Sequence, residues 1–259
     1  MFNPDFAPLS GARSATWRDY LVPQHWEHFT REEHDVWDRL FARQLPYLGE
    51  RIVAPFLEGI PALGLDEPGI PELERLSDRL EQLVGWRLVS VARIVPDEAF
   101  FTMLSERRFP IGNFIRGADS LDYLKEPDCF HDIFGHVPML AQPSIARLME
   151  ALGKLGVEAI VAGHGEVISR LYWHTVEFGL AREGGEVKIL CAGLASSFGE
   201  AHFSLEAEVP RPRFTIRDAA ATPYRNDVFQ PLYFVSDSLE EVAEELEALD
   251  IRGLRRLVA

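Results

Sequence analysis

The stretch Pro127-Asp-Cys-Phe-His131-Asp-Ile-Phe-Gly-His136-Val-Pro138 places two histidines five residues apart among apolar neighbours. Imidazoles buried without partners are costly, because a neutral ring still carries one donor and one acceptor. A metal ion would satisfy one nitrogen of each ring. Core hydrogen bonds could also satisfy both histidines, so the spacing alone leaves two interpretations open.

The five-residue spacing sets a geometric condition on a shared metal. On an α-helix, positions four apart differ in direction by about 40°, whereas positions five apart differ by about 140°. A shared metal therefore requires a π-bulge, which brings i and i+5 nearly into line, or an irregular start at His131. The pattern also differs from the zinc-protease signature, in which the histidines are four apart and a glutamate directly follows the first; here that residue is Asp132.

A third candidate ligand lies in Tyr172-Trp-His-Thr-Val-Glu177-Phe-Gly, where an acid interrupts an aromatic and apolar stretch. Buried carboxylates are usually paired, neutralised or metal-bound. Two histidines and one carboxylate, with the other coordination positions open, form the ligand set of non-haem Fe(II) oxygenases. The alternative partner for Glu177 is Arg170 or Arg182, in a salt bridge.

The rest of the sequence predicts a mainly helical domain with a few short strands and an irregular N-terminal arm over residues 1–29. Capping boxes at Thr30/Glu33 and Ser238/Glu241 mark two helix starts. The expected helices cover 31–45, 47–58, 71–83, most of 143–181 with a break near Gly163, and the segment from Ser238 to Leu249. The expected strands cover 86–95, 187–190 after the Gly184-Gly185 turn, and 228–235. No βαβ alternation is expected.

The composition bounds the function. In 259 residues, 47% are hydrophobic, including 17 Phe and 5 Trp, which is enough for a sizeable core. The 26 basic and 41 acidic residues give a charge of −15, which disfavours nucleic acid and anionic membrane surfaces as partners. Neither a signal peptide nor a spanning segment is recognisable in the sequence. Two cysteines, Cys129 and Cys191, are expected to be free thiols, which favours a cytoplasmic location.

Four motifs together resemble the pterin-dependent aromatic amino acid hydroxylases over roughly residues 25–245. They are the two stretches above, with Leu180 closing the second, Ala192-Gly-Leu-Ala-Ser-Ser-Phe-Gly-Glu200, and Phe229-Gln-Pro-Leu-Tyr-Phe-Val235. The resemblance implies a basket of helices and loops around a deep iron site, with His131, His136 and Glu177 as the iron ligands and catalytic centre. It also implies that phenylalanine is hydroxylated to tyrosine with dioxygen, Fe(II) and tetrahydrobiopterin or a related tetrahydropterin, through a ferryl oxidant.

The same resemblance assigns a pterin-binding segment within Val91–Phe100. Phe100 would stack on the pterin ring, and backbone groups near Ile94, Val95 and Asp97 would bind its edge; without the resemblance, Phe100 would be a core aromatic. Asp132 belongs to this set and replaces a glutamate of the animal members. Pro110 replaces a histidine that helps to seat the pterin there, so the pterin contacts are expected to differ.

The resemblance further implies that Arg116 binds the substrate carboxylate, since its planar fork makes two parallel hydrogen bonds. A solvated surface arginine is the alternative. Asp128 would brace Arg116. The remaining residues of the expected substrate pocket are Tyr172, Trp173, Ser196 and Ser197. Trp173 and Asn226 favour phenylalanine over tryptophan and tyrosine as the substrate.

The expected ligands are therefore L-phenylalanine, dioxygen and a tetrahydropterin, with neither nucleic acid nor membrane as a partner. The sequence resembles the compact bacterial members of the family. Residues 1–259 are therefore expected to form a single catalytic domain, without a regulatory or tetramerisation domain. A monomer is expected, with a weak dimer as the alternative. Two other functions are considered: a zinc hydrolase with the same three ligands, and a binding protein that retains only the fold.

Overall fold

The computed structural model describes residues 16–122, 126–190, 192–225 and 228–257, and it confirms a mainly helical fold. The expectations for Cys191 and Asn226 lie outside the described residues, whereas Cys129 is a buried free thiol. In chain order the elements are η1 (Trp17–Tyr20), η2 (Trp26–His28), α1 (Arg31–Leu48), α2 (Ala54–Leu63), α3 (Leu73–Val84), β1 (Arg87–Val91), α4 (Asp97–Ser105), β2 (Arg108–Gly112), η3 (Phe130–His136), α5 (Val137–Leu140), α6 (Pro143–Val161), α7 (Gly165–Tyr172), η4 (Trp173–Glu177), β3 (Leu180–Glu183), β4 (Glu186–Ile189), α8 (Ala192–Ser196), α9 (Phe198–Ser204), α10 (Ile216–Ala221), β5 (Val235–Ser236), α11 (Leu239–Glu247) and α12 (Ile251–Leu257).

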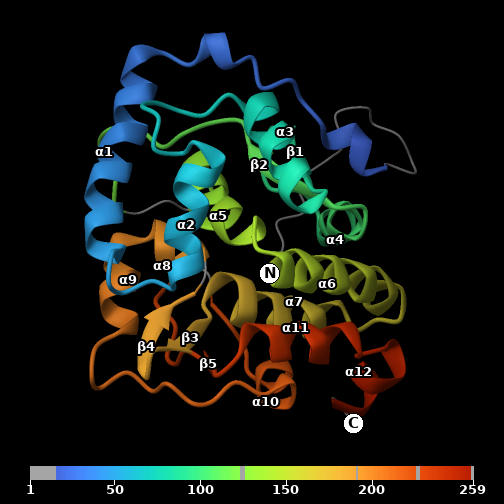
Figure 1. Cartoon of the computed structure of the whole chain (residues 1–259). Coiled ribbons are helices and arrows are strands. Elements are labelled where there is room, and N and C mark those ends of the chain that lie inside the picture. The colour runs from blue at the N-terminus through green and yellow to red at the C-terminus, as the bar shows by residue number, and fades with distance from the viewer. Residues whose placement is uncertain (1–15, 123–125, 191, 226–227, 258–259) are drawn as a thin grey trace.

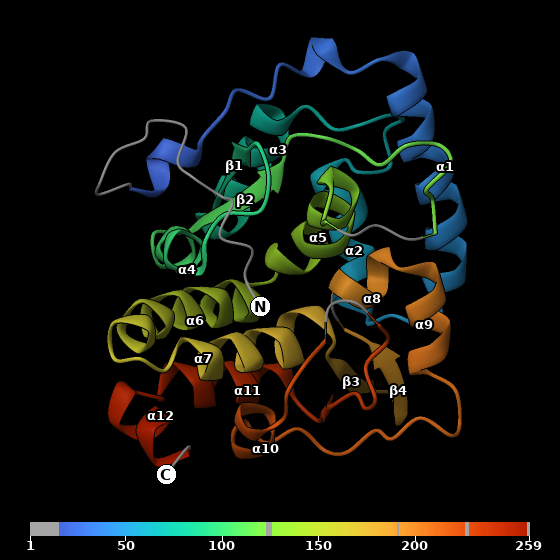
Figure 2. The same ribbon diagram turned by 180° about the vertical axis from the view of Figure 1, so that it is seen from behind.

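The helix α6 crosses the middle of the molecule and packs against α4 on one side and α7 and α11 on the other (Figures 1 and 2). Its Leu148, Met149 and Leu152 are buried. One hydrophobic core extends from Val36 in α1 to Leu254 in α12, so elements from both ends of the described chain share it.

Two small sheets flank this helical centre. The strands β1 and β2 pair in parallel, and α4 connects them, so this part of the chain is a βαβ unit. The expectation of no βαβ alternation was therefore wrong here, because neither α4 nor β2 was among the expected elements. The second sheet has the order β4-β3-β5, and β3 and β4 form the hairpin expected at Gly184 and Gly185, both with positive φ.

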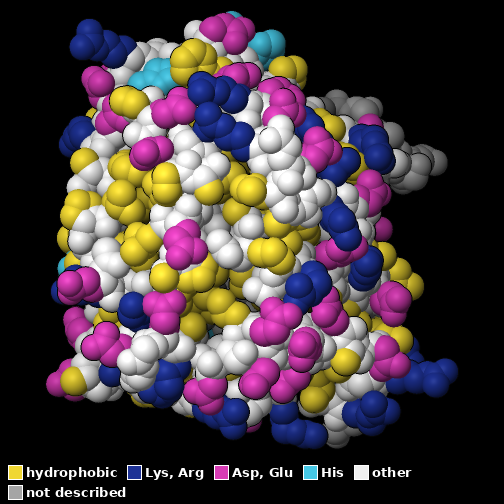
Figure 3. Space-filling view, viewed as in Figure 1, with side chains coloured by type: hydrophobic (Ala, Val, Ile, Leu, Met, Phe, Trp, Pro, Cys, Tyr) yellow, Lys and Arg dark blue, Asp and Glu magenta, His cyan; other side chains and the backbone are white. Residues whose placement is uncertain are grey.

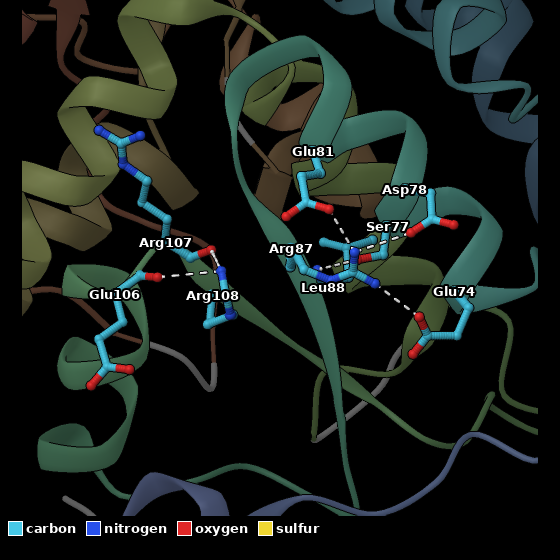
Figure 4. Close-up of polar contacts among 9 residues, drawn as sticks. All are labelled: Glu74, Ser77, Asp78, Glu81, Arg87, Leu88, Glu106, Arg107 and Arg108. Atoms are coloured by element: carbon cyan, nitrogen blue, oxygen red, sulfur yellow. Dashed lines mark hydrogen bonds and ion pairs between the residues drawn. The ribbon is translucent and has the colours of Figure 1, made fainter.

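Polar contacts hold β1 against α3 (Figure 4). Arg87 at the start of β1 donates to Glu74, Asp78 and Glu81, which lie along α3. The buried Ser77 hydroxyl accepts from the Leu88 backbone N–H at 2.9 Å. These contacts hold the start of β1, the strand that leads into residues 92–100.

Two further segments differ from the sequence expectations. The helix predicted over 47–58 begins only at Ala54 and continues through Gly59 to Leu63. Gly59 permits this course, since a Cβ there would lie 2.5 Å from the Pro138 carbonyl oxygen. The strand predicted over 228–235 is reduced to β5, because the Gln230 N–H is taken by the Glu200 carboxylate at 3.1 Å instead of by a neighbouring strand.

On the face shown in Figure 3, acidic and basic side chains are interspersed. Within the described ranges, no helix combines the length and the apolar character needed to cross a bilayer.

Candidate metal centre

Two π-helices carry the three candidate ligands. The segment η3 contains both His131 and His136. Of the two geometries that their five-residue spacing allowed, the structure therefore has the wider π turn and not an irregular start at His131. The segment η4 ends at Glu177, and this second π-helix was not predicted. His136 and Glu177 are buried, and His131 is half-buried.

The three side chains converge on one point. The Nε2 atoms of His131 and His136 are 3.2 Å apart, and the Glu177 carboxylate oxygens lie 3.1 Å from His136 Nε2 and 3.5 Å from His131 Nε2. Bonds of about 2.1 Å separate neighbouring donor atoms by about 3.0 Å at right angles and by about 3.4 Å at the tetrahedral angle. The spacing therefore fits one divalent cation, and it accommodates both geometries.

The hydrogen bonds around His131 assign its tautomer. The Ser196 hydroxyl donates its single proton to the Ala192 carbonyl oxygen at 2.9 Å, so at 2.8 Å it accepts from His131 Nδ1–H. Nε2 then carries a lone pair, directed at His136 and Glu177. A partner on the second nitrogen is the usual way in which proteins orient a metal-binding imidazole.

The electrostatics of the site also favour a cation. Burial lowers the pKa of His131 to about 4, so the ring is neutral at neutral pH and available as a ligand. Burial alone would raise the pKa of Glu177, but the two imidazoles and a hydrogen bond from Tyr172 outweigh it and lower that pKa to about 2. The alternative partners of Glu177 are engaged elsewhere: Arg170 pairs with Glu166, and Arg182 with Asp237.

Glycines let α8 approach both ligand segments closely. A Cβ at Gly135 would lie 2.9 Å from the Ala192 carbonyl oxygen, and a Cβ at Gly193 would lie 2.8 Å from the Glu177 carbonyl oxygen. Both glycines stand in the quoted motifs, but no local pattern indicated that two separate segments meet there. Ser196 contacts His131 from α8, whereas Ser197 is the N-cap residue of α9 and makes no cap hydrogen bond.

Arg116 and Asp128 form a buried ion pair beside the ligands. Asp128 accepts from Arg116 Nε at 2.8 Å and Nη2 at 2.9 Å, and also from the backbone N–H of Arg116 and of His131. Arg116 is 7% exposed, so it is no solvated surface arginine. The expected bracing of Arg116 by Asp128 is present, and the same carboxylate anchors the backbone of the first ligand.

The segment assigned to the pterin runs from the last residue of β1 into the first turn of α4. The Phe100 ring packs edge-to-face on Tyr172, with ring centroids 5.1 Å apart, and Tyr172 is the residue that hydrogen-bonds Glu177. Burial raises the pKa of Asp97 to about 6, although a hydrogen bond from Ser169 opposes the shift. Val95 packs into a small second core, so only its backbone is available to a ligand, and Ile94 is half-buried.

Asp132, which directly follows the first ligand, accepts from the Gly112 N–H at 2.7 Å, at the end of β2. Burial raises its pKa to about 7. This contact joins the first ligand segment to the sheet that precedes it.

Trp173 is stacked on Tyr224, with centroids 4.5 Å apart and planes 10° from parallel, and it also contacts Phe178. Neither Tyr224 nor Phe178 was a predicted site residue. Tyr224 belongs to a segment with no motif around it, whereas Phe178 directly follows Glu177 in the quoted stretch.

Comparison with known proteins identifies the family. Residues 22–256 match the model of the biopterin-dependent aromatic amino acid hydroxylases. The chain is 44% identical over 238 residues to phenylalanine-4-hydroxylase of Caulobacter vibrioides, covering 92% of this chain and 80% of that protein. It is 35% identical to mouse tyrosine 3-monooxygenase over 84% of this chain and 44% of that protein.

The fold agrees with this assignment. The cobalt-bound crystal structure of phenylalanine hydroxylase from Chromobacterium violaceum matches with a TM-score of 0.89 and 38% identity, over 92% of this chain and 87% of that one. The chain therefore belongs to the biopterin-dependent aromatic amino acid hydroxylase family.

Proposed function

We propose that the protein is a phenylalanine 4-monooxygenase, which converts L-phenylalanine to L-tyrosine with dioxygen and a tetrahydropterin. The observation that carries the proposal is the convergence of two imidazoles and one carboxylate on a single point in a chain of this family. Bacterial relatives that bear the name phenylalanine-4-hydroxylase, at 36–44% identity, support the choice of substrate.

In this proposal His131, His136 and Glu177 hold Fe(II). Bound iron and tetrahydropterin together supply the activation of dioxygen. Ser196 keeps the His131 lone pair directed at the metal, and Tyr172 orients the Glu177 carboxylate through its hydrogen bond. With one carboxylate among the three ligands, the site would keep a net positive charge once Fe(II) is bound.

The substrate carboxylate binds Arg116, which Asp128 holds by two parallel hydrogen bonds. These bonds use Nε and one N–H of Nη2, and Nη1 donates to the Leu121 carbonyl oxygen at 3.3 Å. Among the described residues, the other two of the five guanidinium N–H groups have no partner, so they are left for a ligand. Trp173, Tyr172, Ser196 and Ser197 form the remainder of the pocket, while Phe100, Ile94, Val95, Asp97 and Asp132 form the pterin side.

The packing supports one further part of the proposal, namely that residues 1–259 act as one catalytic domain, since elements from both ends of the described chain share one core. We also propose that the protein works as a monomer in the cytoplasm. Light scattering coupled to size exclusion tests the oligomeric state.

Tyrosine formation from phenylalanine tests the function directly. Fe(II) and reduced pterin are omitted in turn, and oxygen uptake is recorded together with tyrosine. Product should require both additions, and Zn(II) should not replace Fe(II). Hydrolase activity with zinc, or no pterin-dependent oxygen uptake with iron present, would refute the proposal.

A further inference from the structure

Glu200 is a buried acid that the proposed chemistry does not use. It lies in α9 and is 7% exposed, and its Oε1 atom accepts from the Gln230 N–H at 3.1 Å and from the Tyr233 hydroxyl at 2.8 Å. Among the described residues it forms no ion pair. Burial raises its pKa to about 7. Its two hydrogen bonds tie α9 to the segment that leads into β5.

The Gln230 side chain in turn binds the backbone of Arg225. Its side-chain Oε1 accepts from the Arg225 N–H at 3.1 Å, and its Nε2 donates to the Arg225 carbonyl oxygen. The amide therefore satisfies both backbone groups of Arg225. Gln230 is fully buried. The position of Arg225 is thus set by Gln230, and that of Gln230 by Glu200.

Tyr224 directly precedes Arg225, and its ring stacks nearly parallel on Trp173. Trp173 opens η4, the π-helix that ends in Glu177. A continuous set of contacts therefore connects Glu200 to Trp173 through Gln230, Arg225 and Tyr224. The hydrogen bonds fix the backbone, and the stack fixes the plane of the indole ring.

We propose that Glu200 is a positioning residue that holds Tyr224 against Trp173, and that this stack determines how well the pocket selects phenylalanine. The inference rests on the proposed function, in which Trp173 forms part of the wall around the substrate ring. A fixed indole plane favours a phenyl ring, whereas a larger substrate ring requires Trp173 to turn. Loss of the stack weakens phenylalanine binding and reduces the preference over tryptophan.

The test compares Glu200→Ala, Tyr224→Ala, their double variant and Glu200→Gln in the iron-loaded enzyme. Each alanine variant should raise the KM for phenylalanine about 3- to 10-fold, the equivalent of one aromatic stack, with a largely unchanged kcat. The double variant should be no worse than Tyr224→Ala, because both changes act on one contact. Glu200→Gln should behave like the wild type, since an amide oxygen accepts the same two hydrogen bonds.

Ser77→Ala is the matched control, because it removes a buried side-chain acceptor of a backbone N–H between α3 and β1. It should lower the melting temperature and leave the KM unchanged. If Glu200→Ala also lowers only the melting temperature, or if the double variant shows the product of the two single effects, the positioning role is wrong.

Hydrogen exchange of the metal-free protein separates this inference from the proposed function. In Glu200→Ala, the amides of Arg225 and Gln230 should exchange faster, whereas Glu200→Gln and Ser77→Ala should leave them unchanged. Unchanged exchange in Glu200→Ala would overturn the inference. If the wild-type protein makes no tyrosine but the variants show this exchange pattern, the proposed function is refuted and the attachment of Tyr224 through Glu200 is retained.

Discussion

Replacing Asp128 by asparagine tests the most deeply buried ion pair of the site. The Asp128 carboxylate is fully buried and accepts four hydrogen bonds, two from the Arg116 guanidinium and two from backbone N–H groups. An asparagine of nearly the same shape removes the charge and turns one acceptor into a donor, which faces the N–H groups of Arg116. The guanidinium is then left buried without a counter-charge.

Breaking a buried pair in this way costs about 3–5 kcal/mol. This is a large part of the roughly 5–15 kcal/mol by which most proteins are stable. Urea unfolding of the metal-free protein at pH 7 should show this loss in the free energy of unfolding. Iron affinity should fall as well, because the same carboxylate anchors the His131 backbone N–H.

Glu106→Gln is the control, since Glu106 pairs with Arg18 at the surface, where the two side chains are 43% and 64% exposed. That change should cost less than about 1 kcal/mol. A similarly small cost for Asp128→Asn would refute the reasoning.

The effect of Asp128→Asn should also depend on pH. Burial opposes ionisation of Asp128, but Arg116 outweighs it and lowers the pKa in the folded state. The contribution of Asp128 is then fully present above the unfolded-state pKa of about 4 and is lost as the pH falls through the lower folded-state pKa. The difference between wild type and variant should therefore shrink below about pH 4.

Three further changes probe the metal site. Ser196→Ala removes the acceptor of His131 Nδ1–H and should weaken Fe(II) binding about 10- to 100-fold in a metal titration; unchanged affinity would exclude the assigned tautomer. Glu177→Gln replaces the anionic ligand by a neutral amide, so the purified protein should retain its circular dichroism spectrum but contain less iron and form less tyrosine, and wild-type turnover would contradict its role as a ligand. Gly193→Ala places a Cβ 2.8 Å from the Glu177 carbonyl oxygen and should cost about 1–3 kcal/mol in urea unfolding, whereas an unchanged midpoint would show that α8 can move away.

The parts of the fold that could be predicted are those with local signals. Thr30 accepts from the Glu33 N–H and Ser238 from the Glu241 N–H, as their capping boxes predicted, and both helices begin at the next residue. Gly85 ends α3 in the left-handed conformation. These features depend on residues three or four apart, which the sequence displays directly.

The parts that could not be predicted depend on distant partners. Residues 228–234 have a β-like composition, but the Gln230 N–H binds Glu200 and the Tyr233 N–H binds the Pro210 carbonyl oxygen. No local pattern encodes either partner. For the same reason Tyr224 was not predicted as a site residue. Its contact with the site is a stack on Trp173, which lies 51 residues earlier in the sequence.

The five-residue spacing proves to be the most informative local signal of the site, because it recurs in the second ligand segment. Tyr172 and Glu177 are also five apart, and η4 brings the Tyr172 hydroxyl to the Glu177 carboxylate much as η3 brings His131 to His136. On a regular α-helix each pair would point about 140° apart. A π turn is less stable than an α turn and needs stabilisation from its surroundings. Here both π turns pack against α8, with a glycine at each closest approach. The wider turn therefore contributes to the site in both segments. In η3 it directs His131 and His136 at a common point, and in η4 it lets Tyr172 orient the Glu177 carboxylate.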